Sequence, residues 1–436
     1  MADIQPFTGL RYNTDIVGDL SSVTTPPYDI ISPEDQDRFY HMHPFNVIRL
    51  ELGKELPEDD ENNNKYTRAA NFLNEWIESG VLKFEDKESL YIYGQDFTAP
   101  DGRQLSCKGL VCLVKLEEFE KGIILPHEET LSKAKSDRMN LLQSTYTNFS
   151  AIYSLYMDQE HEITPVLNQC SESAPDLSFV ASDGVTQKLW VVSDKDIIAK
   201  ITGAFQNKQL FIADGHHRYE TALQFRNKQH ALGTYSEHEK FDYVMMFLAD
   251  IEEEGLLVLP THRMLHNLDN FQEETLIERA NQNFIIEKIP LPQDSVAHYM
   301  ESSIAQKEKT FGLYTGKDYF YTLTLRDIQA QRDALPEKSN AYNNLDVAIL
   351  HTLILEQILG IGQNDMRSGE YLTYTRDSAE AVSSVQSGQY QCSFFLNPTK
   401  ISDIKAVSLE NEKMPQKSTY FYPKLTTGIV MYDFEE

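Results

Sequence analysis

The most informative pattern in this chain is a short apolar run that stops at a glycine turn. Residues 210–213 are apolar, Asp214 and Gly215 follow, and residues 216–230 repeat apolar positions at helical spacing. Such a change of period indicates a buried strand, a tight turn and the start of a helix.

The same periodicity predicts mixed helices and strands elsewhere. Helical spacing predicts helices over 66–77, 160–170 and 194–205, and an apolar helix over 343–359 in which His351 is structural. Alternation in NVIRLEL (46–52) predicts a strand, and a PDGR turn between LYIYGQDF and LSCKGLVCLVKL predicts a hairpin. FDYVMMFLADI is typical of a buried strand, and a short helix is expected over Met139–Gln143.

These elements indicate an α+β fold of mixed sheets with helices. We expect three regions: an N-terminal α+β region over 1–120, a central region over 121–270, and a C-terminal α+β region over 271–436. The central region holds the glycine turn.

Composition narrows the class of partner. The 436 residues include 39 Lys+Arg against 67 Asp+Glu, a formal net charge of -28, which disfavours nucleic acid and anionic membranes as partners. The chain has no signal-peptide pattern and no apolar run long enough to span a membrane. Four cysteines form neither a disulfide scaffold nor a zinc pattern, and Cys107 and Cys112 are interpreted as reduced packing residues. The expected location is the cytoplasm.

The glycine turn carries the strongest candidate chemistry. A helix start presents backbone N–H groups and a partial positive charge, and is a ready anion site. The candidates for binding a phosphate are therefore Gly215, His216, His217 and Arg218, and Asp214 beside them is a candidate catalytic residue that accepts a proton. The alternative is structural: Asp214 caps the helix, Gly215 provides a positive φ, and the histidines pack.

A second polar cluster follows the predicted hairpin. His127 and Glu128 form an acid/base pair, and Lys133 and Arg138 could bind phosphoryl oxygens. An ordinary solvated loop is the alternative.

Two further segments hold secondary candidates. Thr261, His262 and Arg263 follow an apolar strand, a common position for site residues in α/β proteins, and Lys417 lies in a polar segment over 412–425 that also contains Lys424. Asp214, His216, His217 and His262 could instead hold a metal ion for hydrolysis, although adjacent helical residues point about 100° apart and chelate poorly.

Several motifs in order resemble a known family. They are PPYDIIS (26–32), NVIRLELG (46–53), LPHEETL (125–131), DRMNLL with NFSAIYSLY, FIADGHHRYETAL (211–223), LPTHRML (259–265) and KMPQKSTYFYPKL (413–425). Together they resemble the uncharacterised bacterial and archaeal family known as domain of unknown function 1015, over nearly the whole chain.

The DGHHR turn also resembles the phosphate-binding turn of the ParB/sulfiredoxin superfamily, which includes free serine kinases. That resemblance implies a ParB/sulfiredoxin-like strand–turn–helix core within 121–270, nucleotide phosphate at residues 214–218, and Glu128 as a base that activates a hydroxyl.

The leading functional hypothesis is a phosphotransferase or phosphohydrolase acting on a small phosphorylated metabolite, with serine or phosphoserine as examples. ATP or ADP would be the nucleotide, and Mg²⁺ would bridge its phosphate oxygens. A non-enzymatic nucleotide-responsive module is the alternative, in which binding shifts a conformation that a partner reads.

Overall fold

The computed structural model describes residues 1–128, 132–233, 239–292, 295–305 and 307–435, and it does not describe the side chains of residues 132–134 and 367. The chain forms two compact units. The first contains Met1–Pro126, Thr130–Leu257 and Pro423–Glu436, and the second contains His127–Glu129 and Val258–Tyr422.

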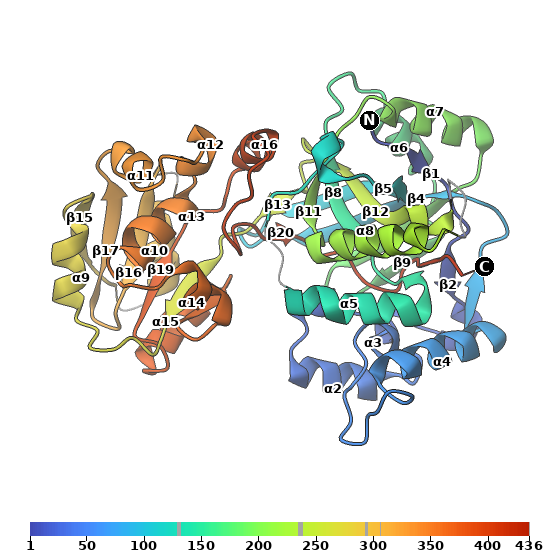
Figure 1. Cartoon of the computed structure of the whole chain (residues 1–436), viewed down its shortest axis with the longest axis horizontal. Coiled ribbons are helices and arrows are strands. Elements are labelled where there is room, and N and C mark those ends of the chain that lie inside the picture. Colours follow the sequence, from blue (N-terminus) through green and yellow to red (C-terminus); the bar gives the residue numbers. More distant parts are fainter. Residues whose placement is uncertain (129–131, 234–238, 293–294, 306, 436) are drawn as a thin grey trace. The chain divides into compact units, whose positions relative to one another are not determined.

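A nine-stranded mixed sheet forms the centre of the first unit (Figure 1). The strand order is β6-β11-β8-β12-β5-β4-β10-β9, and β1 also pairs with β5. The bounds are β1 Ile4–Gln5, β4 Leu90–Thr98, β5 Gln104–Lys115, β6 Ile124–Leu125, β8 Ile152–Tyr156, β9 Leu177–Val180, β10 Thr186–Val192, β11 Leu210–Asp214 and β12 Tyr243–Asp250. Residue 120 is the predicted boundary between the N-terminal and central regions, and strands from both sides of it belong to this sheet. The division into three regions stays a prediction.

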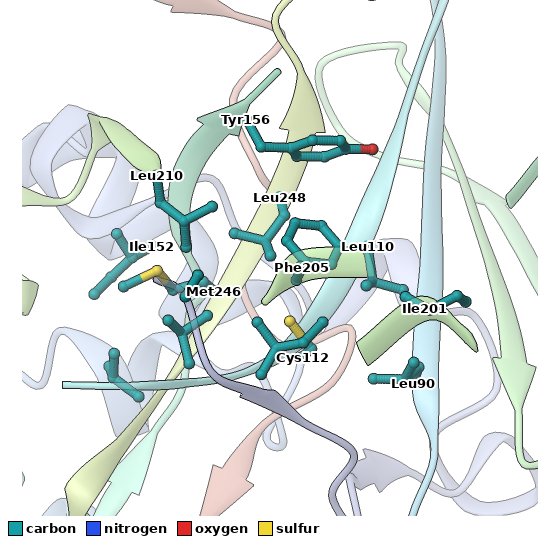
Figure 2. Close-up of a cluster of buried hydrophobic side chains, with 14 of the residues drawn as sticks. Leu90, Leu110, Cys112, Ile152, Tyr156, Ile201, Phe205, Leu210, Met246 and Leu248 are labelled. Atoms are coloured by element: carbon teal, nitrogen blue, oxygen red, sulfur yellow. The ribbon is translucent and has the colours of Figure 1, made fainter. Parts of the chain in front are cut away.

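The continuous apolar run of β12 is explained by its central position. It pairs with β8 in parallel and with β5 in antiparallel orientation, and a strand covered on both faces is apolar throughout. Figure 2 shows side chains of this core, where Met246 and Leu248 of β12 lie among Cys112, Ile152 and Phe205. The buried strand and the packing of the unpaired Cys112 thiol are both confirmed.

Helices and short strands complete the first unit. The predicted helix over 194–205 is confirmed as α7, and the side chain of Asp194 caps its start. The helices are α1 Thr14–Val17, α2 Pro33–Met42, α3 Ile48–Glu51, α4 Lys65–Glu78, α5 Ser132–Thr145, α6 Thr164–Cys170, α7 Lys195–Phe205 and α8 His216–Ala231. The strand pairs are β2 Leu10–Tyr12 with β3 Leu82–Phe84, and β7 Thr147–Asn148 with β21 Tyr432–Asp433. The strand β13, Leu257–Val258, consists of the last residue of the segment Thr130–Leu257 and the first residue of the segment Val258–Tyr422.

The second unit contains a six-stranded antiparallel sheet of order β15-β17-β16-β19-β14-β18. Its strands are β14 His262–Leu265, β15 Phe284–Pro290, β16 Thr310–Tyr314, β17 Tyr319–Leu325, β18 Leu372–Thr375, β19 Cys392–Phe395 and the separate β20 Phe421–Tyr422. Its helices are α9 Glu273–Ala280, α10 Val296–Ile304, α11 Gln329–Ala334, α12 Asn340–Asn343, α13 Asp346–Ile349, α14 Gln363–Ser368, α15 Ser378–Gln386 and α16 Ile401–Leu409, with a π-helix over Leu350–Glu356.

The α+β class with mixed sheets is confirmed, and three local predictions are corrected. The predicted strand over 46–52 is instead the short helix α3, because the Asn46 side chain accepts a hydrogen bond from the Ile48 backbone N–H and the Glu51 backbone N–H donates to the Val47 carbonyl. The predicted helix over 343–359 becomes α13 followed by the π-helix, and the short helix over Met139–Gln143 is part of the longer α5. The ParB/sulfiredoxin-like core stays a prediction.

In the described part of the chain, no helix combines the length and the apolar character needed to cross a membrane.

Candidate functional site

The DGHHR turn lies where β11 passes into α8 in the first unit. The register between β11 and β8 shifts between Ile212 and Asp214, and such irregularities redirect the side chains that follow. Gly215 then adopts φ +92°, a left-handed conformation that favours glycine, and serves as the N-cap of α8. Gly215 has no side chain with which to cap the helix. The first turn of α8 therefore presents its partial positive charge at the end of the strand.

An ion pair fixes the carboxylate of Asp214 at this turn. Lys424 Nζ lies 2.6 Å from Asp214 Oδ2, and the Gly215 backbone N–H donates to Asp214 Oδ1 at 2.8 Å. Burial alone would raise the pKa of Asp214, but the charges of Lys424 and Arg218 outweigh burial and hold that pKa well below its ordinary value. Asp214 is consequently ionised at neutral pH and is a weak proton acceptor. It orients Lys424.

Arg218 covers the turn with its guanidinium group. A Cβ atom on Gly215 would lie 2.9 Å from Arg218 Nη2, so a larger residue than glycine would displace the guanidinium. Arg218 Nη1 donates to Ser150 Oγ at 3.0 Å and to the Ala151 carbonyl at 2.6 Å. Its buried Nε has no hydrogen-bond partner among the described residues. Arg218 thus connects the turn with the segment before β8.

The two histidines of the turn occupy different environments. His216 is buried and contributes to lowering the pKa of Asp214, whereas His217 is partly exposed. His217 is therefore the more accessible imidazole at the turn.

A buried carboxylate and a second arginine lie next to Arg218. Arg138 Nη1 is 3.2 Å from Glu51 Oε1 and 3.0 Å from the Glu51 carbonyl, and the guanidinium lies 4.0 Å from the centre of the Tyr28 ring. Burial raises the pKa of Glu51, while Arg138 and Arg218 oppose that rise. Burial likewise raises the pKa of Tyr28 to about 12. The guanidinium of Arg138 thus contacts Glu51 and Tyr28, and we interpret Arg138 as a residue that positions these two side chains.

A small cavity of about 50 Å³ lies beside these groups in the first unit. Its lining includes Glu51, Arg138, Ser150, Arg218 and Thr221. Thr221 Oγ1 is buried and, like Arg218 Nε, has no hydrogen-bond partner within the described chain. The cavity therefore lies between α5 and α8 with polar groups on its wall.

Sequence reasoning missed three members of this site, Tyr28, Glu51 and Ser150, and it named Lys424 only as part of a polar segment. Tyr28, Glu51 and Ser150 belong to PPYDIIS, NVIRLELG and NFSAIYSLY, and Lys424 to the polar segment over 412–425. What could have indicated these residues in the sequence is that each carries a charged or hydroxyl group within a segment that is otherwise apolar.

The remaining predicted residues gather in the second unit. Glu128 Oε1 accepts a hydrogen bond from the Lys417 backbone N–H at 3.0 Å, and Arg263 Nη2 donates to the Lys417 carbonyl at 3.0 Å. Lys417 adopts φ +55°, which is uncommon for a residue other than glycine. Arg263 Nη1 also donates to the carbonyl of the buried Thr261. The backbone of Lys417 thus links Glu128 with Arg263.

His127 and His262 are fully buried in the second unit. His127 Nε2 lies 2.9 Å from Thr419 Oγ1. His262 Nε2 lies 3.2 Å from Ser378 Oγ, and the Leu396 backbone N–H donates to His262 Nδ1 at 3.3 Å. Because both ring nitrogens of His262 are engaged, the proposed metal site with Asp214, His216 and His217 loses this ligand. Over the described residues, no three His, Cys, Asp or Glu side chains group as metal ligands do.

The structure therefore separates the predicted residues into two groups. The first unit contains Asp214, Gly215, His216, His217, Arg218 and Arg138. The second unit contains His127, Glu128, Thr261, His262, Arg263 and Lys417. The side chain of Lys133 lies outside the described ones.

Fold and site together define an α+β protein with a cation-rich strand–turn–helix element. The family model described as "Protein of unknown function (DUF1015)" matches residues 4–348, and the chain belongs to this family. No curated protein matches the chain.

Three solved structures are similar at low identity. A free serine kinase in complex with AMP is 11% identical, with a TM-score of 0.38 over 74% of this chain and 91% of the kinase. A conserved hypothetical protein from Pyrococcus furiosus is 12% identical, with a TM-score of 0.34 over 72% of this chain and 92% of that one. C-terminally truncated SbnI from Staphylococcus aureus is 12% identical, with a TM-score of 0.34 over 73% of this chain and 85% of that one.

The Asp214–Lys424 pair predicts a pH-dependent contribution to stability. A carboxylate whose pKa is depressed by folding stabilises the protein above its unfolded pKa of about 4, and this contribution disappears as the pH falls toward the folded pKa. Lys424→Met should lower the free energy of unfolding by roughly 2 kcal/mol at pH 7 and by clearly less at pH 3, as measured by urea denaturation.

Lys188→Met is the matched control, because Lys188 pairs with Asp96 while both side chains are at least 32% exposed. That change should cost less than about 1 kcal/mol at either pH. An equal loss for Lys424→Met at pH 7 and pH 3 would contradict the assignment.

Proposed function

We propose that the DGHHR turn binds a phosphoryl group and that the protein is a phosphotransferase or phosphohydrolase acting on a small phosphorylated metabolite. The observation that carries this proposal is the turn itself: α8 starts at a glycine, the guanidinium of Arg218 covers that glycine, and Lys424 is held beside it by Asp214. A helix start with two adjacent cations favours a compact anion.

Each residue of the turn has a distinct role in the proposal. Backbone N–H groups of the first turn of α8 and the guanidinium of Arg218 hold phosphoryl oxygens, and His217 adds a donor. Asp214 keeps Lys424 in place instead of accepting a proton, because the pKa of Asp214 is too low for efficient proton transfer at neutral pH. His216 is buried and supports the turn.

The turn suits a ligand that brings its own negative charge. The overall charge of -28 repels anions at long range, so binding depends on this local cluster. ATP or ADP, and serine or phosphoserine, are the nucleotide and metabolite that we propose. The nearby carboxylates of Asp214 and Glu51 are engaged by Lys424 and Arg138 and do not fit a protein-held ion, so we assign no residue to Mg²⁺.

Glu128 is the residue that we propose as proton acceptor. Its carboxylate is oriented by the backbone N–H of Lys417, and a carboxylate is one of the usual groups that deprotonate a hydroxyl. His127 is buried beside it and bonded to Thr419, which suits a supporting role.

Ligand binding at the turn is the first test. We expect isothermal titration to detect saturable binding of ATP, ADP or phosphoserine to the wild type, and Arg218→Ala to weaken it at least tenfold, because charge-assisted hydrogen bonds contribute about 1.5–3 kcal/mol.

Arg226→Ala is the control, since Arg226 lies in the same helix but pairs with Glu118. It should leave binding unchanged. Thermal unfolding verifies that both variants are folded, and the absence of binding of all three ligands to the wild type would overturn the proposal.

Turnover tests the role of Glu128. Glu128→Gln keeps an oxygen that can accept from the Lys417 N–H but removes the base, so kcat should fall by about 100-fold or more while ligand affinity stays within a factor of about two. An unchanged kcat would exclude Glu128 as the base.

A nucleotide-responsive module without catalysis is the second function compatible with this turn. It predicts saturable nucleotide binding with no product after prolonged incubation with candidate acceptors. Product formation under the same conditions supports the enzyme.

A further inference from the structure

A second cavity, of about 80 Å³, lies entirely within the second unit. Residues from the π-helix, from β18 and from the segment before β20 line it, among them His351, Thr352, Glu356, Tyr374 and Gln416. The proposed function uses none of these five.

Unpartnered polar atoms are concentrated on this wall. His351 Nε2, Tyr374 Oη and Gln416 Nε2 are each shielded from solvent and have no hydrogen-bond partner in the described part of the chain. The His351 side chain itself is only 7% exposed. A buried polar atom without a partner costs about 1–3 kcal/mol, so three around one cavity indicate that something else satisfies them.

A buried positive charge adjoins the same wall. The guanidinium of Arg263 is 1% exposed and lies 5.4 Å from the centre of the Tyr374 ring. Burial lowers the pKa of Arg263 to about 10, which leaves it cationic at neutral pH. Its Nη atoms donate to the Thr261 and Lys417 carbonyls, which are neutral groups, and its Nε has no hydrogen-bond partner among the described residues. An uncompensated buried cation is costly unless an anion approaches it.

The charge and the backbone both indicate the class of ligand. Burial and, secondly, the charge of Arg263 hold the pKa of His351 well below its ordinary value, so the imidazole is neutral and Arg263 supplies the one buried positive charge of this group. A single buried cation is matched by a singly charged anion, and phosphate at neutral pH carries more charge. His351 and Thr352 belong to a π-helix, a distortion that is frequent at functional sites.

We propose that this cavity binds the carboxylate group of a small molecule. Tyr374 Oη and Gln416 Nε2 donate to the carboxylate oxygens, the neutral His351 adds a third polar contact, and Arg263 balances the charge. The proposal does not rest on the function of the DGHHR turn.

The test measures binding of acetate and of glycine to the full chain. Binding is measured by isothermal titration or from the chemical shifts of selectively labelled histidine and tyrosine. We expect saturable binding of at least one of them at one site per chain. Tyr374→Phe and Gln416→Leu should each weaken it about three- to tenfold, the value of one lost hydrogen bond. Tyr371→Phe, at a tyrosine that does not line the cavity, and Arg218→Ala, in the other unit, should leave binding unchanged.

Other outcomes overturn the proposal. The first is that neither acetate nor glycine binds saturably, and the second is that Arg218→Ala weakens binding while Tyr374→Phe does not. The third is that inorganic phosphate binds more tightly than acetate and that this binding depends on Tyr374. The fourth is that a crystal structure with acetate in excess shows water alone in the cavity. Thermal unfolding of Tyr374→Phe, which loses one hydroxyl group, verifies that the fold is retained.

Discussion

The ion pair between Asp214 and Lys424 joins two segments that are far apart in the chain and fixes the turn at which α8 begins. Asp214 also accepts a hydrogen bond from Gly215, so the pair sets the entry of the helix as well as the position of a lysine. Arg218 depends on the same turn, because its guanidinium occupies the space that a side chain at position 215 would fill. Charge balance and backbone conformation therefore support each other at this site.

The sequence predicted the elements whose hydrophobic period is unambiguous. Local pattern predicted the buried strand β12, the helix α7, and the strand, turn and helix at DGHHR. The predicted strand over 46–52 was wrong, because alternation alone cannot show that the polar Glu51 is buried or that the Asn46 side chain bonds the Ile48 backbone N–H at the start of a helical turn. Its polar residue Glu51 is buried because Arg138, from a distant part of the chain, pairs with it.

Convergence of distant residues was the part that local pattern could not reveal. Lys424 and Asp214 are separated by 210 positions, and no periodicity connects them. The motifs that identify the family nevertheless contribute Tyr28, Glu51, Arg138 and Arg218 to one buried network. In the second unit, Arg263 is a buried cation beside polar groups that have no hydrogen-bond partner among the described residues. One of these groups is His351, which the sequence analysis interpreted as structural.

Hydrogen–deuterium exchange at the start of α8 observes the backbone N–H groups that are proposed to hold the phosphoryl group. With ATP, ADP or phosphoserine in excess, the account predicts slower exchange in peptides that cover residues 215–219, without a comparable change around Tyr374 in the second unit. Unchanged exchange at residues 215–219 with all three ligands would contradict the assignment of a phosphoryl site to this turn.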